Sequence, residues 1–177
     1  MSMRIRQWAT VVACVGLATC SNLDNIDVDA QGEGTIPAAT PLETLLSNFD
    51  LGAFNRIDFS QSFKNQGASK DDVDSVRVKS FQLSIPAPPG QTFDFLQSVA
   101  FYAESSGQPR VRIAHLDAVP RGASSLQVSI DPGVELKPYV VAPQMSITTE
   151  ATGSRPQQES TVKAEVTLDV DIHTGCE

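Results

Sequence analysis

The feature that most constrains the fold is an unbroken two-residue alternation near the C-terminus. Apolar side chains occupy every second position from Val162 to Ile172, and polar or charged side chains occupy the positions between them. Because successive side chains of a β-strand point to opposite faces, this pattern predicts a strand with one buried and one solvated face. Such a strand is typical of an antiparallel sheet rather than of a parallel sheet covered by helices.

Shorter alternating segments, separated by turns rich in Gly, Pro and Ser, run from residue 55 onward. These predicted strands contain Ile57 and Phe59, Val76 to Ile85, Val99 to Ala103, Val111 and Ile113, Leu126 to Ile130, and Met145 to Thr149. The parity of the apolar positions changes between Val78 and Phe81, which predicts a β-bulge near Lys79 and Ser80. About seven or eight antiparallel strands at this spacing predict a β-sandwich.

One short amphipathic helix is predicted near the N-terminal end of this domain. Within T-P-L-E, Thr40 occupies an N-cap position, Pro41 the first helical position, and Glu43 the position that bonds back to the cap. The apolar stripe that follows at helical spacing consists of Leu42, Leu45, Leu46 and Phe49. We expect this helix to extend to about Asn48 and to cover an open end or edge of the sheet core. A second helical turn is predicted to begin at Ser69, because the acidic residues that follow it are stabilised by the positive N-terminal end of a helix dipole.

The N-terminus has the organisation of an export signal. Arg4 and Arg6 precede an uncharged, mostly apolar run from Trp8 to Ala18. That run is shorter than the roughly 20 apolar residues needed to span a bilayer. A basic start, a short apolar run and small residues before a cleavage site are typical of a secretory signal peptide, so we predict that residues 1–19 are removed.

The tetrapeptide L-A-T-C at Leu17–Cys20 resembles the lipobox of bacterial lipoproteins, in which the Cys thiol receives a diacylglycerol before cleavage. Thr19 stands where that family usually has Gly, Ala or Ser. By this resemblance Cys20 becomes the first residue of the mature chain and carries acyl chains, palmitate among them, that hold it on a membrane. Ser21, rather than Asp, follows the lipid site, which implies the outer membrane of a two-membrane bacterium. Two alternatives stay open: a box ending at Cys14, and a secretory leader that leaves Cys20 unmodified.

The segment from Ser21 to Gly34 is polar and acidic, and we predict a flexible tether there. Its D-V-D-A-Q-G run from Asp27 matches the first half of a calcium loop, but the twelfth position is Ala38 instead of Glu, so no calcium site is predicted. The mature domain is also similar, in general pattern, to small uncharacterised β-sandwich lipoproteins of two-membrane bacteria, which implies no activity. The predicted organisation is a signal peptide at 1–19, a lipidated tether at 20–34 and a single β-sandwich domain at 35–177.

Charge and cysteine content restrict the partners and the covalent structure. Loss of the leader removes two arginines and no acid, so the mature chain has eleven basic and twenty-one acidic residues. This balance argues against nucleic acid as a partner, because phosphate binding needs clustered Lys and Arg. With Cys14 in the leader and Cys20 acylated, Cys176 remains as a single thiol, and no internal disulfide is predicted.

Candidate catalytic residues are few, and we predict neither enzymatic activity nor a cofactor. The sequence has no G-x-S-x-G, H-E-x-x-H or C-x-x-C motif, and its histidines are His115 and His173. The best chemical cluster is Asp169, Asp171 and His173, which share one face of the last predicted strand about 6.5 Å apart. These groups could accept a divalent cation. The favoured interpretation is a solvated acidic face that discourages aggregation.

Two roles compete for such a domain. The first is a non-catalytic envelope lipoprotein with a binding or structural role, whose partner is an envelope protein or polymer. The alternative is a carrier of a hydrophobic ligand or lipid. In a carrier, a group of mainly aromatic side chains would line an internal cavity; in a domain without a ligand, the same side chains would fill the core. That group consists of Phe93, Phe95, Leu96, Phe101 and Tyr102. Hydroxyl side chains that can bind sugars or another sheet occupy the outward positions Ser80, Ser129, Ser146, Thr148 and Thr167.

Overall fold

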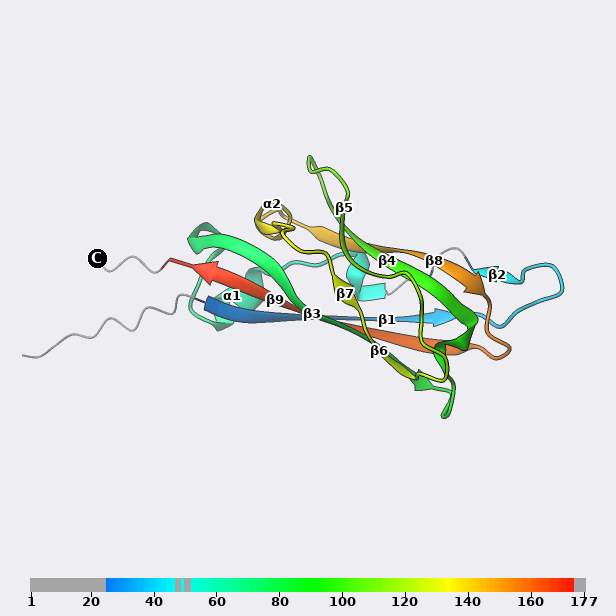
Figure 1. Ribbon diagram of the computed structural model, residues 1–177. Helices are drawn as coiled ribbons and strands as arrows, with labels where there is room; N and C mark the ends of the chain where they lie inside the picture. The colour runs from blue at the N-terminus through cyan, green and yellow to red at the C-terminus, as the bar shows by residue number, and fades with distance from the viewer. Residues whose placement is uncertain (1–24, 47–48, 50–51, 174–177) are drawn as a thin grey trace, which may run out of the picture.

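The computed structural model describes residues 25–46, 49 and 52–173. These residues form two antiparallel sheets that pack face to face, a four-stranded sheet with the order β1-β9-β3-β6 and a five-stranded sheet with the order β2-β8-β4-β5-β7 (Figure 1). The strands are β1 (Asn25–Ile36), β2 (Leu45–Leu46), β3 (Val73–Ala87), β4 (Leu96–Ser105), β5 (Val111–Leu116), β6 (Ser125–Gln127), β7 (Ser129–Ile130), β8 (Met145–Ser154) and β9 (Ser160–Ile172). The α-helices are α1 (Ser60–Asn65) and α2 (Lys137–Val140), and 3₁₀ turns occupy Gly52–Asn55, Lys70–Asp72 and Phe93–Phe95. The predicted antiparallel β-sandwich is confirmed.

Strand β9 lies inside the four-stranded sheet, between β1 and β3. Every second residue from Ser160 to Ile172 is buried, and the apolar residues among them are at most 4% exposed. The alternation predicted from the sequence is therefore confirmed along the whole strand. Because β9 is paired on both sides, its inward side chains are shielded at both edges as well as by the opposite sheet.

The predicted β-bulge is also confirmed. The register between β3 and β9 shifts between Val78 and Ser80. Before the shift Val76 is fully buried, and after it Phe81 and Leu83 are fully buried on the opposite sequence parity. The extra residue thus keeps one continuous apolar face along a strand whose sequence changes phase.

Aromatic side chains fill the space between the sheets. Phe81 from β3 and Phe101 from β4 have ring centres 4.2 Å apart, and Phe54 meets Phe81 edge-on at 6.4 Å. Four members of the predicted aromatic group are buried in this core: Phe93, Phe95, Leu96 and Phe101. Tyr102, the fifth member, lies half-buried on the outer face of β4.

The predicted flexible tether at 20–34 is wrong for residues 25–34, which belong to β1. This strand pairs with β9 along its whole length, from Asn25 opposite Asp171 to Ile36 opposite Ser160. Its buried positions include Ile26 and Val28, while acidic residues occupy exposed positions between them. The acidic composition suggested disorder, but the acids alternate with inward-facing residues, and β9 supplies the backbone partners that an isolated segment lacks. Among the described residues, the sandwich therefore already includes Asn25.

The prediction of a helix from Thr40 is wrong for the described part of that segment. The Thr40 hydroxyl does accept the Glu43 amide at 3.1 Å, as an N-cap would, but the backbones of the same two residues also exchange hydrogen bonds in a tight turn. Leu45–Leu46 then pairs with β8 as the short edge strand β2. Leu42 and Leu45 are 96% and 82% exposed, whereas Phe49 is buried in the core, so the predicted stripe does not form one face. A helix this short is marginal alone, and the free edge of β8 offers the backbone an alternative.

The strand predicted around Ile57 and Phe59 is reduced to a single bridge between Ile57 and Met145. Helix α1 follows, with the Asp58 carboxylate accepting hydrogen bonds from the amide and hydroxyl of Ser60. Phe59 and Phe63 are buried one helical turn apart. The spacing of these two aromatics, with an Asp-x-Ser start, is the helical signal that a strand assignment overlooks. None of the helices in the described ranges is long and apolar enough to cross a bilayer.

The helical turn predicted at Ser69 is confirmed as the 3₁₀ turn Lys70–Asp72. The Ser69 amide and hydroxyl both donate to the Asp72 carboxylate, at 2.7 and 2.8 Å. These bonds, and the reciprocal bond from the Asp72 amide to Ser69, form a capping box. The turn delivers the chain into β3.

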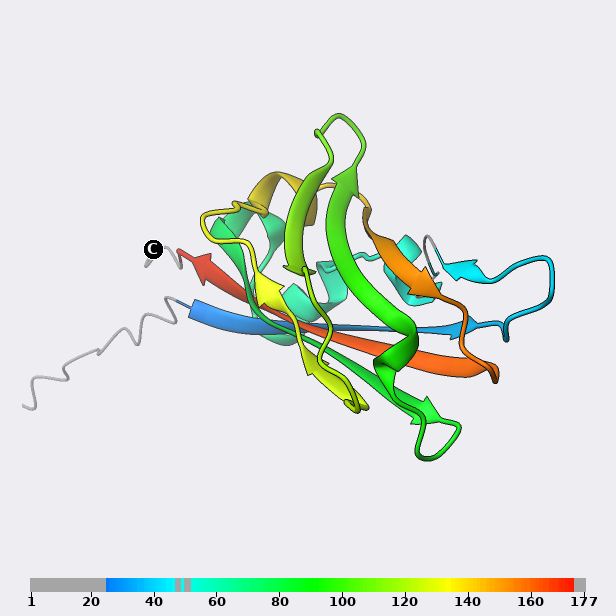
Figure 2. The same cartoon turned by 45° about the vertical axis from the view of Figure 1, so that its right-hand side comes forward.

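The strand predicted from Leu126 to Ile130 divides between the two sheets. Leu126 pairs with Leu83 in the four-stranded sheet, and Ile130 pairs with Ala114 in the five-stranded sheet. Val128 lies between them, and its amide donates to the Phe81 carbonyl at 2.9 Å. This segment crosses from one layer to the other and closes that side of the sandwich (Figure 2).

Candidate functional site

The outer face of the five-stranded sheet brings together polar groups from three strands. In the middle of this face, Ala100 on β4 is paired with His115 on β5 and with Glu150 on β8. In the neighbouring row Tyr102 is paired with Arg112 and Thr148. Since paired residues on one face have Cβ atoms about 4.5–5.5 Å apart, these rows place imidazole, guanidinium, phenol and carboxylate groups side by side.

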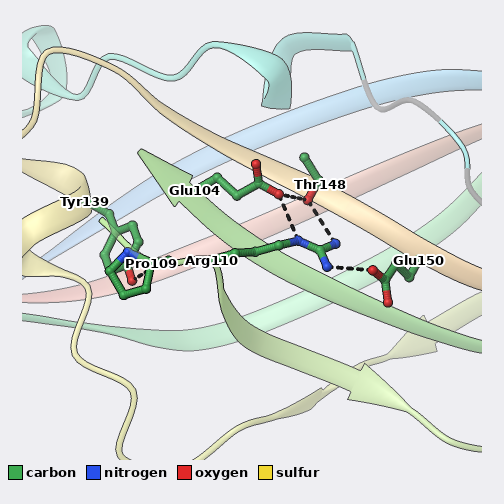
Figure 3. A network of polar contacts seen from close by, with 6 residues as sticks. All are labelled: Glu104, Pro109, Arg110, Tyr139, Thr148 and Glu150. Carbon is green, nitrogen blue, oxygen red and sulfur yellow. Dashed lines mark hydrogen bonds and ion pairs between the residues drawn. The ribbon is translucent and has the colours of Figure 1, made fainter. Parts of the chain in front are cut away.

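Arg110, just before β5, is the centre of a hydrogen-bond network on this face (Figure 3). Its Nε donates to Glu104 Oε1 at 2.9 Å, and its terminal nitrogens donate to Glu150 Oε1 at 2.5 Å and Thr148 Oγ1 at 3.4 Å. The Thr148 hydroxyl in turn donates to Glu104 Oε1 at 2.7 Å. Every guanidinium nitrogen of Arg110 is engaged, so this side chain links β4, β8 and the start of β5.

Tyr102 belongs to the same network, and its aromatic ring contacts the Arg110 guanidinium. The guanidinium carbon of Arg110 lies 3.6 Å from the ring centre of Tyr102, a cation–π contact. The hydrogen bond from Arg110, and then that from Tyr102, lower the pKa of Glu150. Burial, followed by the Glu150 carboxylate, raises the pKa of Tyr102. At neutral pH the network therefore holds an ionised Glu150 and a protonated Tyr102.

Helix α2 fixes the other side of this turn. The Tyr139 hydroxyl donates to the carbonyl of Pro109 at 2.6 Å, one residue before Arg110 (Figure 3). Tyr139 is itself buried. The turn that carries Arg110 is thus held from the core side as well as from the sheet face.

A second charged group lies beside the network, around Asp131. Arg112 donates from Nε to Asp131 Oδ2 at 2.8 Å and from a terminal nitrogen to Oδ1 at 3.0 Å, a bidentate ion pair. His115 Nδ1 is 3.1 Å from the same Oδ1 but lies off the direction of a hydrogen bond, and it has no hydrogen-bond partner among the described residues. The Arg112 bond is the main cause that lowers the pKa of Asp131. His115, one of the two histidines of the sequence, is half-buried in this group.

A hollow of about 340 Å³ opens on the same face, and we call it the Ala100 hollow. Ala100 lies in its middle, because a methyl group between the longer His115 and Glu150 side chains leaves space above the sheet. The hydroxyls of Ser98 and Thr152, 2.6 Å apart, line one end. The wall on the β5 side includes Arg112, His115 and Asp117.

The hollows elsewhere on the described part of the surface include three others. They have volumes of about 500 Å³ beside Glu104 and Ser146, about 410 Å³ beside Gln91 and Gln158, and about 220 Å³ beside Ser80 at the β-bulge. Each is lined mainly by polar side chains, and none of the four is an apolar cavity between the sheets.

The structure separates the candidate metal ligands Asp169, Asp171 and His173. The Asp171 carboxylate accepts hydrogen bonds from the Ser75 hydroxyl and, at 3.3 Å, from the Asn25 side-chain amide. His173 Nδ1 instead lies 2.9 Å from Asp74 Oδ1. Within the described part of the chain, no three His, Cys, Asp or Glu residues converge as a metal site would require. The predicted lipid site Cys20 lies outside the described residues, as do Cys14 and Cys176.

The residues around Arg110 and Asp131 were not singled out from the sequence. The signal that was available is the shared parity of Arg110 and Arg112, which places two arginines on one face of a predicted strand. Their partners Glu150 and Asp131 are 40 and 19 residues away along the chain. Only the pairing of the strands identifies which carboxylate meets which arginine.

Replacing Asp131 with Asn is expected to cost stability at neutral pH, and this cost is expected to shrink in acid. Arg112 lowers the folded-state pKa of Asp131, so the stabilisation is complete above the ordinary Asp pKa of about 3.9 and disappears as the pH falls through the lowered value. Urea unfolding of both proteins at neutral pH and at about pH 3 measures this difference. The control is Asp117→Asn, at a side chain that is 89% exposed. A cost of Asp131→Asn that is equal at both pH values would contradict the ionic role.

Neither a family model nor a curated protein matches the chain. Among solved structures, the decameric form of the BFDV capsid protein is similar with a TM-score of 0.41 and 10% identity, covering 84% of this chain and 98% of that chain. The 60-mer form of the same protein has a TM-score of 0.36 and 9% identity, covering 86% of this chain and 95% of that chain. At these TM-scores the likeness carries no inference about what this chain does.

Proposed function

We propose that this chain is a lipid-anchored lipoprotein of the cell envelope, with a non-catalytic β-sandwich that has a binding or structural role. The observation that carries the proposal is where the first strand begins. Strand β1 starts at Asn25, so only the four residues from Ser21 to Asp24 separate it from Cys20 of the L-A-T-C motif. A leader, a lipid site and a folded domain thus follow one another directly in the sequence.

This short connection also orients the proposed anchor. Five steps along an extended chain span at most about 18 Å, so Asn25 would stay within that distance of the lipidated residue. Asn25 is paired with Asp171, and β1 begins and β9 ends at the same end of the sandwich (Figure 1). That end would face the bilayer of the outer membrane, while β2 and the turn before it lie at the opposite end (Figure 2).

Two features favour a binding or structural role over the carriage of a hydrophobic ligand. The space between the sheets is occupied by the Phe54, Phe81 and Phe101 side chains, whereas polar groups gather on the outer face of the five-stranded sheet. On that face the ring nitrogen of His115 has no hydrogen-bond partner among the described residues, and the Ser98 and Thr152 hydroxyls lie nearby, so these groups could make hydrogen-bonded contact with an envelope protein or polymer. The acidic balance of the mature chain argues against nucleic acid.

Metabolic labelling with an alkyne analogue of palmitate tests the anchor in cells. Wild-type protein and the Cys14→Ser variant are expected to incorporate the label, and Cys20→Ser is expected to lose it, because its hydroxyl does not replace the thiol in thioether formation. The matched pair distinguishes the two lipobox-like motifs. Labelling of Cys20→Ser at the wild-type level would overturn the proposed attachment site, and loss of label only in Cys14→Ser would move it to Cys14.

A further inference from the structure

We propose that the Ala100 hollow binds a neutral saccharide. This inference rests on the binding role proposed above and assigns it a site and a class of ligand. The size of the hollow is the first step: about 340 Å³ is near the lower end of the range for small-molecule sites. His115 and Glu150 flank Ala100 in the cross-strand pairing, so they would stand on either side of a ring laid over the Ala100 methyl group.

The chemistry of the rim is the second step. Ser98 and Thr152 supply hydroxyls that both donate and accept, Asp117 supplies an exposed acceptor, and His115 supplies a ring nitrogen without a hydrogen-bond partner among the described residues. A sugar hydroxyl donates one hydrogen bond and accepts others, so a rim that mixes donors with acceptors matches it. The methyl group of Ala100 forms the apolar part of the floor, where the C–H face of a pyranose ring could rest.

The charge of the rim is the third step, and it favours a neutral ligand over an ion. Glu150 is already bound by Arg110 at 2.5 Å, and Arg112 is already bound by Asp131 through two hydrogen bonds. A charged ligand would have to compete with these internal partners for either group. Tyr102 does not offer a free aromatic platform on this side, because Arg110 lies over its ring. Hydrogen bonds to hydroxyl groups are therefore the contacts left for recognition.

The test is a titration of the full-length chain in detergent micelles, followed by the NMR shifts of its backbone amides. The neutral probes are N,N′,N″-triacetylchitotriose and maltotriose, and the charged comparators are glucosamine and galacturonate. We expect saturable shifts with at least one neutral trisaccharide, centred on the amides of β4, β5 and β8 around Ala100. Shifts with neither trisaccharide, shifts centred elsewhere, or saturation only by a charged comparator would overturn the proposal.

Two variants assign the binding to the hollow. Ala100→Leu fills its floor, and we expect the affinity to fall about tenfold or more, which corresponds to about 1.4 kcal/mol. Thr161→Leu adds the same side chain to a half-buried position of β9 in the opposite sheet and should leave the affinity unchanged. Thr152→Val removes one rim hydroxyl at nearly constant shape, and about a threefold loss or more is expected.

The outcomes also separate this site from the broader role. If Ala100→Leu and Thr152→Val bind the trisaccharide as tightly as Thr161→Leu, the site is wrong even if the domain binds saccharides elsewhere. If saccharide binding is absent but Cys20 is acylated, the ligand class is wrong and the anchored domain stands. If binding is lost in Ala100→Leu while Cys20 carries no lipid, the site stands and the anchor is wrong.

Discussion

Replacing Leu168 with Ala is expected to lower the free energy of unfolding by about 2–5 kcal/mol. Leu168 is 1% exposed in the middle of β9, where it pairs with Val28 on one side and Val78 on the other. Because β9 is hydrogen-bonded to β1 on one side and to β3 on the other, its backbone cannot shift to fill the space that the truncated side chain leaves. The loss would be a large part of a total stability of about 5–15 kcal/mol. Urea unfolding of the full chain measures it.

The neighbouring residue provides the matched control. Asp169 lies on the outer face of the same strand, and Asp169→Ala should change the stability by no more than about 0.5 kcal/mol. Equal losses in the two variants would contradict the assignment of the two faces. A stabilisation by Zn²⁺ or Ca²⁺ that disappears in Asp169→Ala would restore the metal cluster of Asp169, Asp171 and His173.

Replacing Phe81 with Ala is expected to cost about 3–5 kcal/mol. The Phe81 ring is fully buried. Its centre lies 4.2 Å from the ring centre of Phe101 in the opposite sheet, and Phe54 contacts it edge-on. Its removal leaves a cavity where the two sheets are in direct contact. Urea unfolding gives the loss, and Phe81→Leu should recover part of it because most of the volume returns. A loss below about 1 kcal/mol for Phe81→Ala would contradict a filled core and would favour the hydrophobic-ligand carrier.

The central part of the fold was predictable because the inward and outward positions of β9 and β3 differ strongly in polarity. The change of parity between Val78 and Phe81 predicted the bulge, since only an extra residue keeps both on the buried face. Strand β1 was missed for the opposite reason. Its inward positions include the small residues Ala30 and Gly32, so its alternation is weak, and pairing with β9 decides its structure.

In the segment at Thr40, pairing with the distant strand β8 outweighs the local N-cap pattern that predicts a helix. The hydroxyl-to-amide bond of an N-cap formed as predicted, but the helix did not, because Gly153 and Ser154 of β8 lie beside Leu45–Leu46. The candidate site was hidden for a related reason. Arg110 and Glu150 come together through the pairing of β4 with β5 and β8, a register that no local pattern contains.

Intact-mass analysis of the protein purified from membranes tests the lipid anchor most directly. If the leader is removed at the L-A-T-C motif, as proposed, Cys20 becomes the first residue, and the expected mass is that of residues 20–177 plus the attached acyl chains. A chain that begins at Cys20 with two or three acyl groups is the expected result. A mature chain that begins at another residue, or that begins at Cys20 without acyl groups, would contradict the lipoprotein account.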